Sequence, residues 1–372
     1  MSFYIYQQPA WPQFTWDEHS LSRLLGEVRY VQGRSAGRME GLGFSVREET
    51  MLQTLTQDVL KSTEIEGELL EPDQVRSSIA RRLGMDIAGL IPSDRDVEGV
   101  VEMMLDATQN YQEPLTKERL CNWQSSLFPT GRSGMYKIII GAWRDNEKGP
   151  MQVISGPLGR ERVHFEAPDA PRLEREMEKF LDWFNGESVL DPVLKAGVAH
   201  LWFVTLHPFD DGNGRVARAI TDMQLARAEK GGQRYYSMSA QIRQERNAYY
   251  HILEKTQKGT LDITPWLEWF LFCLISALHA AEEKLEAVLQ KARFWDLHAE
   301  TPLNERQRLL IRKLQDGFVG KLTSSKWAKI AKCSQDTAGR DIQDLIGKGI
   351  LRKDAAGGRS TSYSLVNDEQ AF

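Results

Sequence analysis

Apolar residues recur at helical spacing along most of this chain. In the stretch 48–64, for example, Met51, Leu52, Leu55 and Val59 fall on one face of a helix. The same spacing predicts helices over 21–32, 48–64, 72–84, 94–111, 116–127, 171–186, 190–206, 214–229, 243–257 and 264–290. The pattern therefore indicates a mainly α-helical protein.

Strand signals are few. The clearest pair runs from 151 to 155 and from 162 to 165, with the turn sequence Gly-Pro-Leu-Gly at 156–159 between them. Short apolar runs separated by such a turn predict a β-hairpin. We therefore expect a small hairpin within a helical domain.

The C-terminal part follows a different plan. Short helices are predicted at 304–315, 325–331 and 334–347, followed by strands at 351–352 and 362–365 with a flexible tip at 355–358. Three small helices and a strand pair are typical of a winged helix-turn-helix domain. The prediction for this region is a separate C-terminal module.

Charge supports that division. The 372 residues carry a net charge of −5, but residues 301–372 hold 13 Lys/Arg against 8 Asp/Glu, whereas the rest holds 34 against 44. The three cysteines are far apart, which excludes a disulfide framework and fits a reducing, cytoplasmic location. No signal peptide is visible, and the apolar stretch 266–281 is predicted to be a buried helix, so no membrane partner is expected.

The most informative segment is 207–218, which reads His-Pro-Phe-Asp-Asp-Gly-Asn-Gly-Arg-Val-Ala-Arg. It lies between two predicted helices and leads into the start of the second. Unpaired N–H groups and the helix dipole favour a bound phosphate at such a position. The segment therefore predicts a nucleotide-handling loop.

Each side chain of the segment suits that chemistry. His207 can accept a proton from an attacking hydroxyl, and Asp211 is a hard oxygen ligand that suits Mg²⁺. The amide of Asn213 can bond a phosphate oxygen. The remaining candidates are Gly212 and Gly214, which allow close backbone approach to phosphates, and Arg215 and Arg218, which share a helix face and can clamp the outer phosphates. Phe209 is predicted to anchor the loop in the apolar interior.

Other readings exist for each residue taken singly. His207 alone could be a helix-terminal residue, Asp-Gly-Asn-Gly is an ordinary turn sequence, and two arginines three apart often form a solvated face. All of these readings would have to hold together at fixed spacing to explain the string.

The complete pattern His-x-Phe-x-Asp/Glu-Gly-Asn-Gly-Arg-x-x-Arg resembles the signature of the Fic family, with all eight fixed positions present. Most members are adenylyltransferases that move AMP from ATP to a Ser, Thr or Tyr hydroxyl of a protein. The resemblance implies ATP as substrate, Mg²⁺ as cofactor, a protein target and, because Fic cores often pair, a homodimer.

A second element resembles the family's inhibitory pattern Ser/Thr-x-x-x-Glu-Gly/Asn, at Ser62, Glu66 and Gly67. Ser62 and Glu66 are four residues apart and share a helix face, and Gly67 can end the helix. The resemblance implies that Glu66 pairs with Arg218 and occupies the donors that the γ-phosphate needs. The alternative is a surface carboxylate near a helix end.

Two further regions are assigned by the resemblance. The hairpin at 151–165 corresponds to the flap that docks the target, with Met151, Val153 and Ile154 as candidates for pairing with an extended peptide. Tyr249 or Tyr250 would contact the adenine base, with Gln257 as a hydrogen-bond partner. A structural hairpin and core tyrosines are the respective alternatives, and the sequence leaves open whether Arg144 is structural or faces phosphate.

These expectations combine into an autoinhibited protein adenylyltransferase. Its predicted parts are an N-terminal region at 1–90 with the inhibitory helix at about 49–67, a Fic core at 91–290 and a winged helix at 296–372. The first 50 residues resemble a small domain found ahead of Fic cores, with Trp11, Phe14 and Trp16 as packing anchors. Two alternatives stay open, a DNA-binding transcriptional regulator with a Fic sensor core and a Glu66-dependent removal of AMP from a modified protein.

Overall fold

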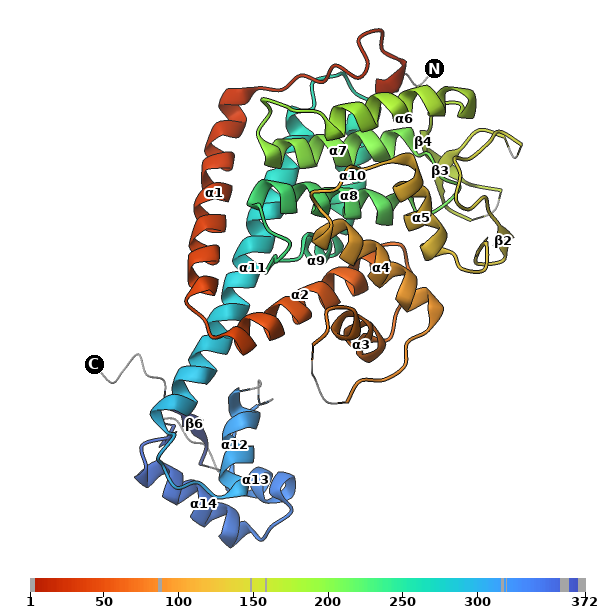
Figure 1. The fold of residues 1–372 in the computed structure, drawn as a ribbon. Coiled ribbons are helices and arrows are strands. Elements are labelled where there is room, and N and C mark those ends of the chain that lie inside the picture. Colours follow the sequence, from red (N-terminus) through yellow and green to blue (C-terminus); the bar gives the residue numbers. More distant parts are fainter. Residues whose placement is uncertain are drawn as a thin grey trace. The chain divides into compact units, whose positions relative to one another are not determined.

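The structure is a computed structural model that describes residues 4–85, 89–147, 149–157, 159–315, 318, 320–354 and 361–366. The chain divides into two compact units, 1–283 and 284–372, and the boundary falls within helix α11. Both units are built mainly from helices (Figure 1). The predicted mainly α-helical class is confirmed.

Eleven α-helices begin in the first unit among the described residues. Most predicted helices are present with shifted bounds; the predicted helix at 243–257 corresponds to α10, and the short helix α9 before it was not predicted. The helices are α1 (Glu18–Glu40), α2 (Phe44–Ile65), α3 (Pro72–Arg82), α4 (Arg95–Gln109), α5 (Lys117–Leu127), α6 (Ala170–Asn185), α7 (Pro192–Leu206), α8 (Asn213–Glu229), α9 (Met238–Gln244), α10 (Arg246–Gln257) and α11 (Thr264–Leu297). A short 3-10 helix, Ile5–Gln7, precedes them.

Two small hairpins interrupt the helices of this unit. The predicted hairpin is present as β3 (Gln152–Ser155) and β4 (Arg162–Glu166), with an irregular register between Val153 and Ile154. A second hairpin, β1 (Arg132–Ser133) with β2 (Tyr136–Lys137), was not predicted, because strands of two residues are too short to give a periodic signal.

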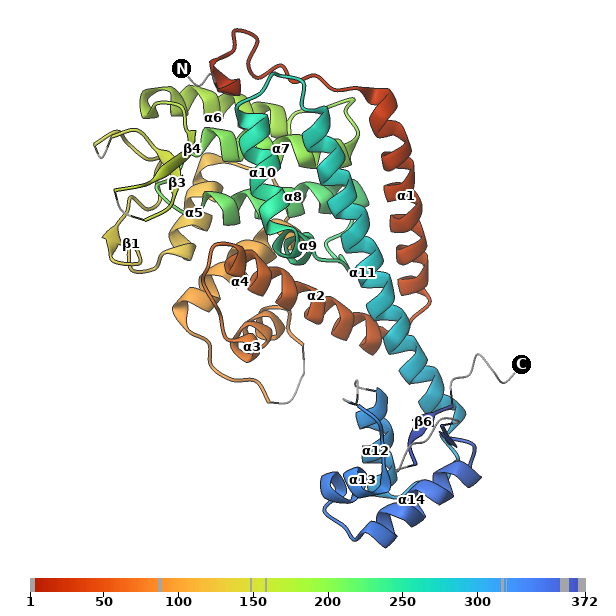
Figure 2. The ribbon, with the colours of Figure 1, turned by 180° about the vertical axis from the view of Figure 1, so that it is seen from behind.

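Helices α7 and α8 form the centre of the unit and lie side by side in both views (Figures 1 and 2). Every residue of α7 from Val193 to Leu206 is buried, as is Val216 to Ala226 in α8. An apolar helix without a polar face belongs in a protein interior. The six-residue loop between these helices is therefore held on a rigid support.

Helix α2 packs against α3, α9 and α8 (Figure 2). Its buried face includes Leu52, Leu55 and Val59 from the predicted apolar stripe. At its other end, Glu66 is the C-cap residue and Gly67 has φ +89. Because glycine adopts positive φ at little cost, Gly67 ends the helix as predicted.

The N-terminal aromatic residues are packing anchors, as predicted. Trp11 is 9 % exposed, and its indole N–H donates to Glu176 at 3.0 Å. Phe14 packs edge-on against Trp202 of α7, and Trp16 is partly buried against the same core. These contacts join residues 4–16 to the helices of the first unit.

The second unit has its own apolar core around Trp327 and Ile342. It contains α12 (Glu305–Gln315), α13 (Ser324–Ala331), α14 (Gln335–Gly347) and the antiparallel pair β5 (Leu351–Lys353) and β6 (Tyr363–Leu365). The order of elements is the one that the sequence predicts. The predicted tip at 355–358 lies outside the described residues.

Helix α14 carries three acidic residues, Asp336, Asp341 and Asp344. Asp341 is 4 % exposed and forms an ion pair with Arg306 at 2.8 Å. Asp344 pairs with Lys348. Two of the three acidic residues of this helix are therefore neutralised within the unit, and DNA binding stays a prediction.

Helix α11 passes a length and composition test for a membrane span among the described residues. Yet 56 % of its most apolar window is buried inside the protein. Trp266, Leu267 and Leu271 of this helix are fully buried in the first unit. The burial is that of a core helix, as the sequence analysis expected for 266–281.

Candidate functional site

His207 lies at the end of α7 in an unusual backbone conformation. Its φ of 49° places it in the left-handed region, which non-glycine residues seldom adopt. Arg144, which is 3 % exposed, fixes this conformation: its Nε donates to the carbonyl of His207 at 2.8 Å, and its own N–H donates to Pro208 O at 2.9 Å. Arg144 therefore makes structural contacts to the loop, and its Nη1 is buried without a hydrogen-bond partner, so a role toward phosphate stays open.

The imidazole of His207 is suited to accept a proton. Burial lowers its pKa from 6.5 to about 4, and nearby Arg144 adds to that shift. Nδ1 lies 3.3 Å from the carbonyl of Val204, which assigns the proton to Nδ1 and leaves the lone pair on Nε2. The side chain is therefore neutral near pH 7, as a general base requires.

The loop itself is ordered by Asn213. Its Oδ1 accepts from the N–H of Phe209 at 3.0 Å, and its Nδ2 donates to the carbonyl of Phe209 at 2.8 Å. Asn213 is 2 % exposed and Phe209 is fully buried. Both ends of the amide are engaged with the loop backbone, so this side chain shapes the loop, and its predicted phosphate contact stays a prediction.

The two glycines of the motif occupy places where a side chain would collide. Gly212 has φ +88, and a Cβ there would lie 3.0 Å from the ring of Phe128. A Cβ on Gly214 would lie 2.3 Å from Oε1 of Glu66. The backbone at Gly214 is therefore open to a close neighbour, and in this structure that neighbour is the glutamate.

Arg218 is held by Ser62 and Glu66, and its predicted pairing with Glu66 is present. Its Nη2 donates to Glu66 Oε1 at 2.7 Å and to the carbonyl of Ser62 at 2.8 Å, and its Nε donates to Ser62 Oγ at 2.9 Å. Arg218 is 2 % exposed, and its Nη1 is buried without a hydrogen-bond partner. A buried donor without an acceptor is costly, so the site is suited to an additional anionic oxygen.

Arg215 is occupied in a way that the sequence analysis missed. Its Nη1 donates to Oε2 of Glu68 at 2.8 Å, and its guanidinium lies 5.0 Å from the ring centre of Phe128. Glu68 follows Glu66 by two residues, so one short segment brings a carboxylate to each motif arginine. The sequence carries no clear signal for this contact, because it depends on the turn at Gly67, whose φ is +89.

Asp211 lies where a metal ligand is expected, and its Oδ2 accepts a hydrogen bond from Ser133 Oγ of β1. No cluster of three or more His, Cys, Asp or Glu side chains suited to a metal occurs within the described part of the chain. Mg²⁺ is commonly held by one or two carboxylates together with substrate phosphates and waters. A single carboxylate at Asp211 fits that mode of binding.

The residues expected around the adenine base differ in their exposure. Tyr249 is 2 % exposed and its hydroxyl lies 2.9 Å from His200 Nε2, which makes it a core residue. Tyr250 is 38 % exposed, and partial burial raises the pKa of its phenol, with nearby Glu66 adding to the shift. Gln257 is 5 % exposed and donates to Thr205 at 3.3 Å. Of the predicted pair, Tyr250 is the one accessible to a base.

The predicted flap is attached beside the loop by Arg144, whose Nη2 donates to Pro168 O at 2.5 Å. Among the predicted docking residues, Ile154 is 55 % exposed, whereas Met151 and Val153 pack partly against the core. Glu254 of α10 secures the other strand by accepting from His164 at 2.7 Å and from Arg162 at 2.9 Å. Ile154 is therefore the candidate whose side chain is available to a partner.

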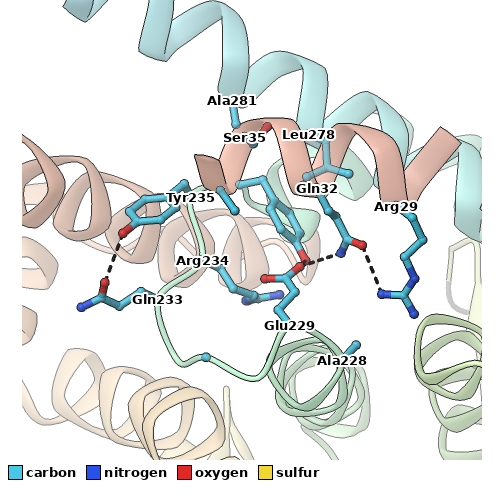
Figure 3. Close-up of a pocket in the computed structure, with 14 residues that line it drawn as sticks. Arg29, Gln32, Ser35, Ala228, Glu229, Gln233, Arg234, Tyr235, Leu278 and Ala281 are labelled. Atoms are coloured by element: carbon cyan, nitrogen blue, oxygen red, sulfur yellow. Dashed lines mark hydrogen bonds between the residues drawn. The ribbon is translucent and has the colours of Figure 1, made fainter. Parts of the chain in front are cut away.

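A separate cavity of about 340 Å³ lies between α1, the end of α8 and α11 (Figure 3). Arg234 lines it, is 3 % exposed and forms ion pairs with Asp222 of α8 at 2.7 Å and Asp58 of α2 at 3.6 Å. Glu229 accepts from Gln32 at 2.7 Å in the same cavity. The Arg234 cluster thus connects the helix that carries Glu66 with the helix that carries Arg218.

The loop brings together a partly buried histidine, a carboxylate and two arginines at a helix start. The Fic/DOC family matches residues 114–225, and a domain of unknown function, DUF4172, matches residues 4–85. Residues 114–225 of this chain are thus similar to the Fic/DOC family.

Relatives and solved structures point to the same family. Proteins named protein adenylyltransferase Fic from Drosophila willistoni and Drosophila melanogaster are 38 % and 37 % identical over 99 residues, which is 26 % of this chain and 18 % of theirs. The match thus spans less than a fifth of these relatives. A crystal structure of a Fic family protein from Desulfovibrio desulfuricans G20 has a TM-score of 0.55 at 20 % identity, covering 95 % of this chain and 98 % of that one. A Fic-domain signalling protein from Bacteroides thetaiotaomicron VPI-5482 reaches 0.50 at 21 % identity, covering 70 % and 95 %. At these identities the solved structures support the fold.

Proposed function

We propose that this protein is an autoinhibited adenylyltransferase that transfers AMP from ATP to Ser, Thr or Tyr hydroxyls of a target protein, and to its own hydroxyls, releasing pyrophosphate. The name of the Drosophila relatives supports AMP transfer. The observation that carries the proposal is the pairing of Glu66 with Arg218 at 2.7 Å. The Glu66 carboxylate also lies over Gly214, and His207 of the same loop is neutral because its pKa is lowered.

In the active state each side chain of the loop has a separate role in binding or catalysis. Arg218 and Arg215 hold the outer phosphates through charge-assisted hydrogen bonds, and the N–H groups at the start of α8 face the phosphates. His207 Nε2 takes the proton of the target hydroxyl as its oxygen attacks the α-phosphorus. Asp211 would hold Mg²⁺, which neutralises phosphate charge when bound. With Mg²⁺ bound, the Ser133 hydroxyl would lose its hydrogen bond to Asp211.

In the resting state Glu66 takes the position of an anion. It uses the Nη2 donor of Arg218 and fills the space above Gly214. A γ-phosphate cannot share that space with a carboxylate, because like charges in a buried site repel. ATP then lacks the contact that would place its α-phosphorus in line with the target hydroxyl.

Transfer from α-labelled ATP into lysate proteins and into the enzyme tests the proposal. We expect low labelling by the wild type, high labelling by Glu66→Ala and none by Glu66→Ala/His207→Ala. Glu64→Ala is the matched control, because Glu64 lies on the same helix but pairs with Lys61 and Arg243 rather than with Arg218. Equal labelling by the Glu64 and Glu66 variants would contradict the inhibitory role.

A Glu66-dependent removal of AMP is the second candidate, favoured by the position of the Glu66 carboxylate inside the site. There it would orient a water molecule toward the phosphorus of a modified hydroxyl. A target labelled by Glu66→Ala and then purified would lose its label when incubated with the wild type and keep it with Glu66→Ala. Label retained with both proteins excludes this second activity.

A further inference from the structure

The unpredicted hairpin β1–β2 lies directly on the motif loop. Ser133 of β1 donates to Oδ2 of Asp211, and the N–H of Ile139, just after β2, donates to Oδ2 of Asp210 at 3.0 Å. The turn between the strands is two residues long and begins with Gly134, whose φ is +54. The hairpin is thus attached to the catalytic loop on both sides of Tyr136.

The register of the hairpin determines where Tyr136 lies. Ser133 and Tyr136 are paired directly across the two strands. Side chains of a directly opposed pair project from the same face, with their Cβ atoms about 4.5–5.5 Å apart. Since Ser133 contacts Asp211 from that face, Tyr136 projects on the side of the hairpin that faces the motif.

Tyr136 is also available for reaction. It is 79 % exposed, so its phenol is not held in the core. Tyr30 is exposed to a similar extent at 65 %, but it lies on α1 with Arg34 over its ring. The two tyrosines therefore share exposure and differ in their relation to Asp211.

We propose that Tyr136 is an acceptor of AMP from the site of its own chain. The Oη of Tyr136 attacks the α-phosphorus of ATP and forms a new P–O bond. The bond between the α-phosphorus and the bridging oxygen breaks, pyrophosphate leaves, and the phenolic proton goes to Nε2 of His207. This inference depends on the proposed transfer of AMP and identifies one hydroxyl that receives it.

A consequence for the site follows from the contact with Asp211. AMP on Tyr136 places a bulky anion on the hairpin face that carries the Ser133–Asp211 bond. A bound phosphate group near the Asp211 carboxylate is repelled by it. Modified enzyme is therefore expected to label target proteins more slowly than unmodified enzyme.

The test uses the full chain with the Glu66→Ala substitution, incubated with Mg·ATP. Intact mass spectrometry should show the addition of one AMP, and peptide mapping should place it on Tyr136. The addition should be lost in Glu66→Ala/Tyr136→Phe and kept in the matched Glu66→Ala/Tyr30→Phe. Modification that maps elsewhere, or that persists in the Tyr136→Phe protein at the same level, overturns the assignment.

Two measurements distinguish transfer of AMP within one chain from transfer between two chains. The fraction of Tyr136 modified per minute should not change over a tenfold dilution of the enzyme. In a mixture of Glu66→Ala/Tyr136→Phe with Glu66→Ala/His207→Ala, Tyr136 of the second protein should stay unmodified. Its modification in the mixture would contradict the step within one chain.

Failure of this inference is distinguishable from failure of the proposed function. If Glu66→Ala labels lysate proteins while its own Tyr136 stays unmodified, only the inference is wrong. If Glu66→Ala labels neither lysate proteins nor itself, the proposed transfer of AMP is wrong as well.

Discussion

Glu68 and Arg215 form an ion pair at 2.8 Å, and Glu66, two residues before Glu68, pairs with Arg218 at 2.7 Å. Both arginines that would clamp phosphate are thus occupied by carboxylates of one segment. The two pairs differ in exposure, since the side chain of Glu68 is 51 % exposed and that of Glu66 is 30 % exposed. Solvent screens the Glu68 pair more strongly, so Glu66 should dominate the inhibition.

Removing the second carboxylate should have a small effect of predictable sign. Exposed ion pairs contribute about 0.2–1 kcal/mol, so Glu68→Gln should raise labelling at limiting ATP by at most about fivefold. Glu71→Gln, an exposed glutamate of the same segment without a contact to either arginine, is the control. The measurement is the initial labelling rate, and no gain over Glu71→Gln would show that Glu68 does not restrain ATP.

The role assigned to Asn213 predicts a loss of stability as well as of activity. Asn213→Ala leaves the buried N–H and carbonyl of Phe209 without partners, which costs about 1–3 kcal/mol for each group. We expect a lower melting temperature and little transfer in a Glu66→Ala background. If Asn213 acted on phosphate alone, the variant would lose transfer with an unchanged melting temperature.

The pH dependence of transfer follows from the lowered pKa of His207. A base with a pKa of about 4 is neutral above that pH, and its contribution is lost only as the pH falls toward 4. The kcat/KM of the Glu66→Ala enzyme should therefore show no titration of His207 between pH 5.5 and 8. An imidazole titration near pH 6.5, seen by NMR and absent in His207→Ala, would contradict the buried, neutral state.

The free energy of unfolding is expected to fall with rising pH because of Asp58, whereas a carboxylate with a lowered pKa has the opposite effect. Burial raises its pKa from 3.8 to about 7, with nearby Asp222 adding to the shift. The folded state therefore holds a proton that the unfolded state releases, so stability falls as the pH rises from about 4 to 7. Asp58→Asn should reduce this slope in denaturant titrations at pH 5 and pH 7.5. An equal slope in wild type and variant would show that Asp58 is not the titrating group.

The sequence predicted the parts of the site whose function depends on residue type at fixed spacing. Ser62 and Glu66 both contact Arg218, whereas the roles of His207 and Asp211 stay predictions. Their chemistry requires those side chains at those intervals on helices that the apolar pattern already identifies. The mainly α-helical fold was predictable for the same reason.

Features that depend on tertiary contacts were not predictable. Asn213 looks like a phosphate ligand in the sequence, and only the loop geometry shows that the backbone of Phe209 uses both ends of its amide. The burial of Asp341 and Tyr249 depends on distant helices. The hairpin with Tyr136 has too few residues for a periodic pattern, so its contact with Asp211 is known only from the structure.

The account depends on the triphosphate lying between His207 and Arg218 once Glu66 is removed. A crystal structure of Glu66→Ala with Mg²⁺ and a non-hydrolysable ATP analogue tests it most directly. We predict the γ-phosphate on the Arg218 guanidinium, where Glu66 lies in the resting protein, and the α-phosphorus next to Nε2 of His207. An empty loop at saturating analogue, with no heat of binding by calorimetry, would contradict the account.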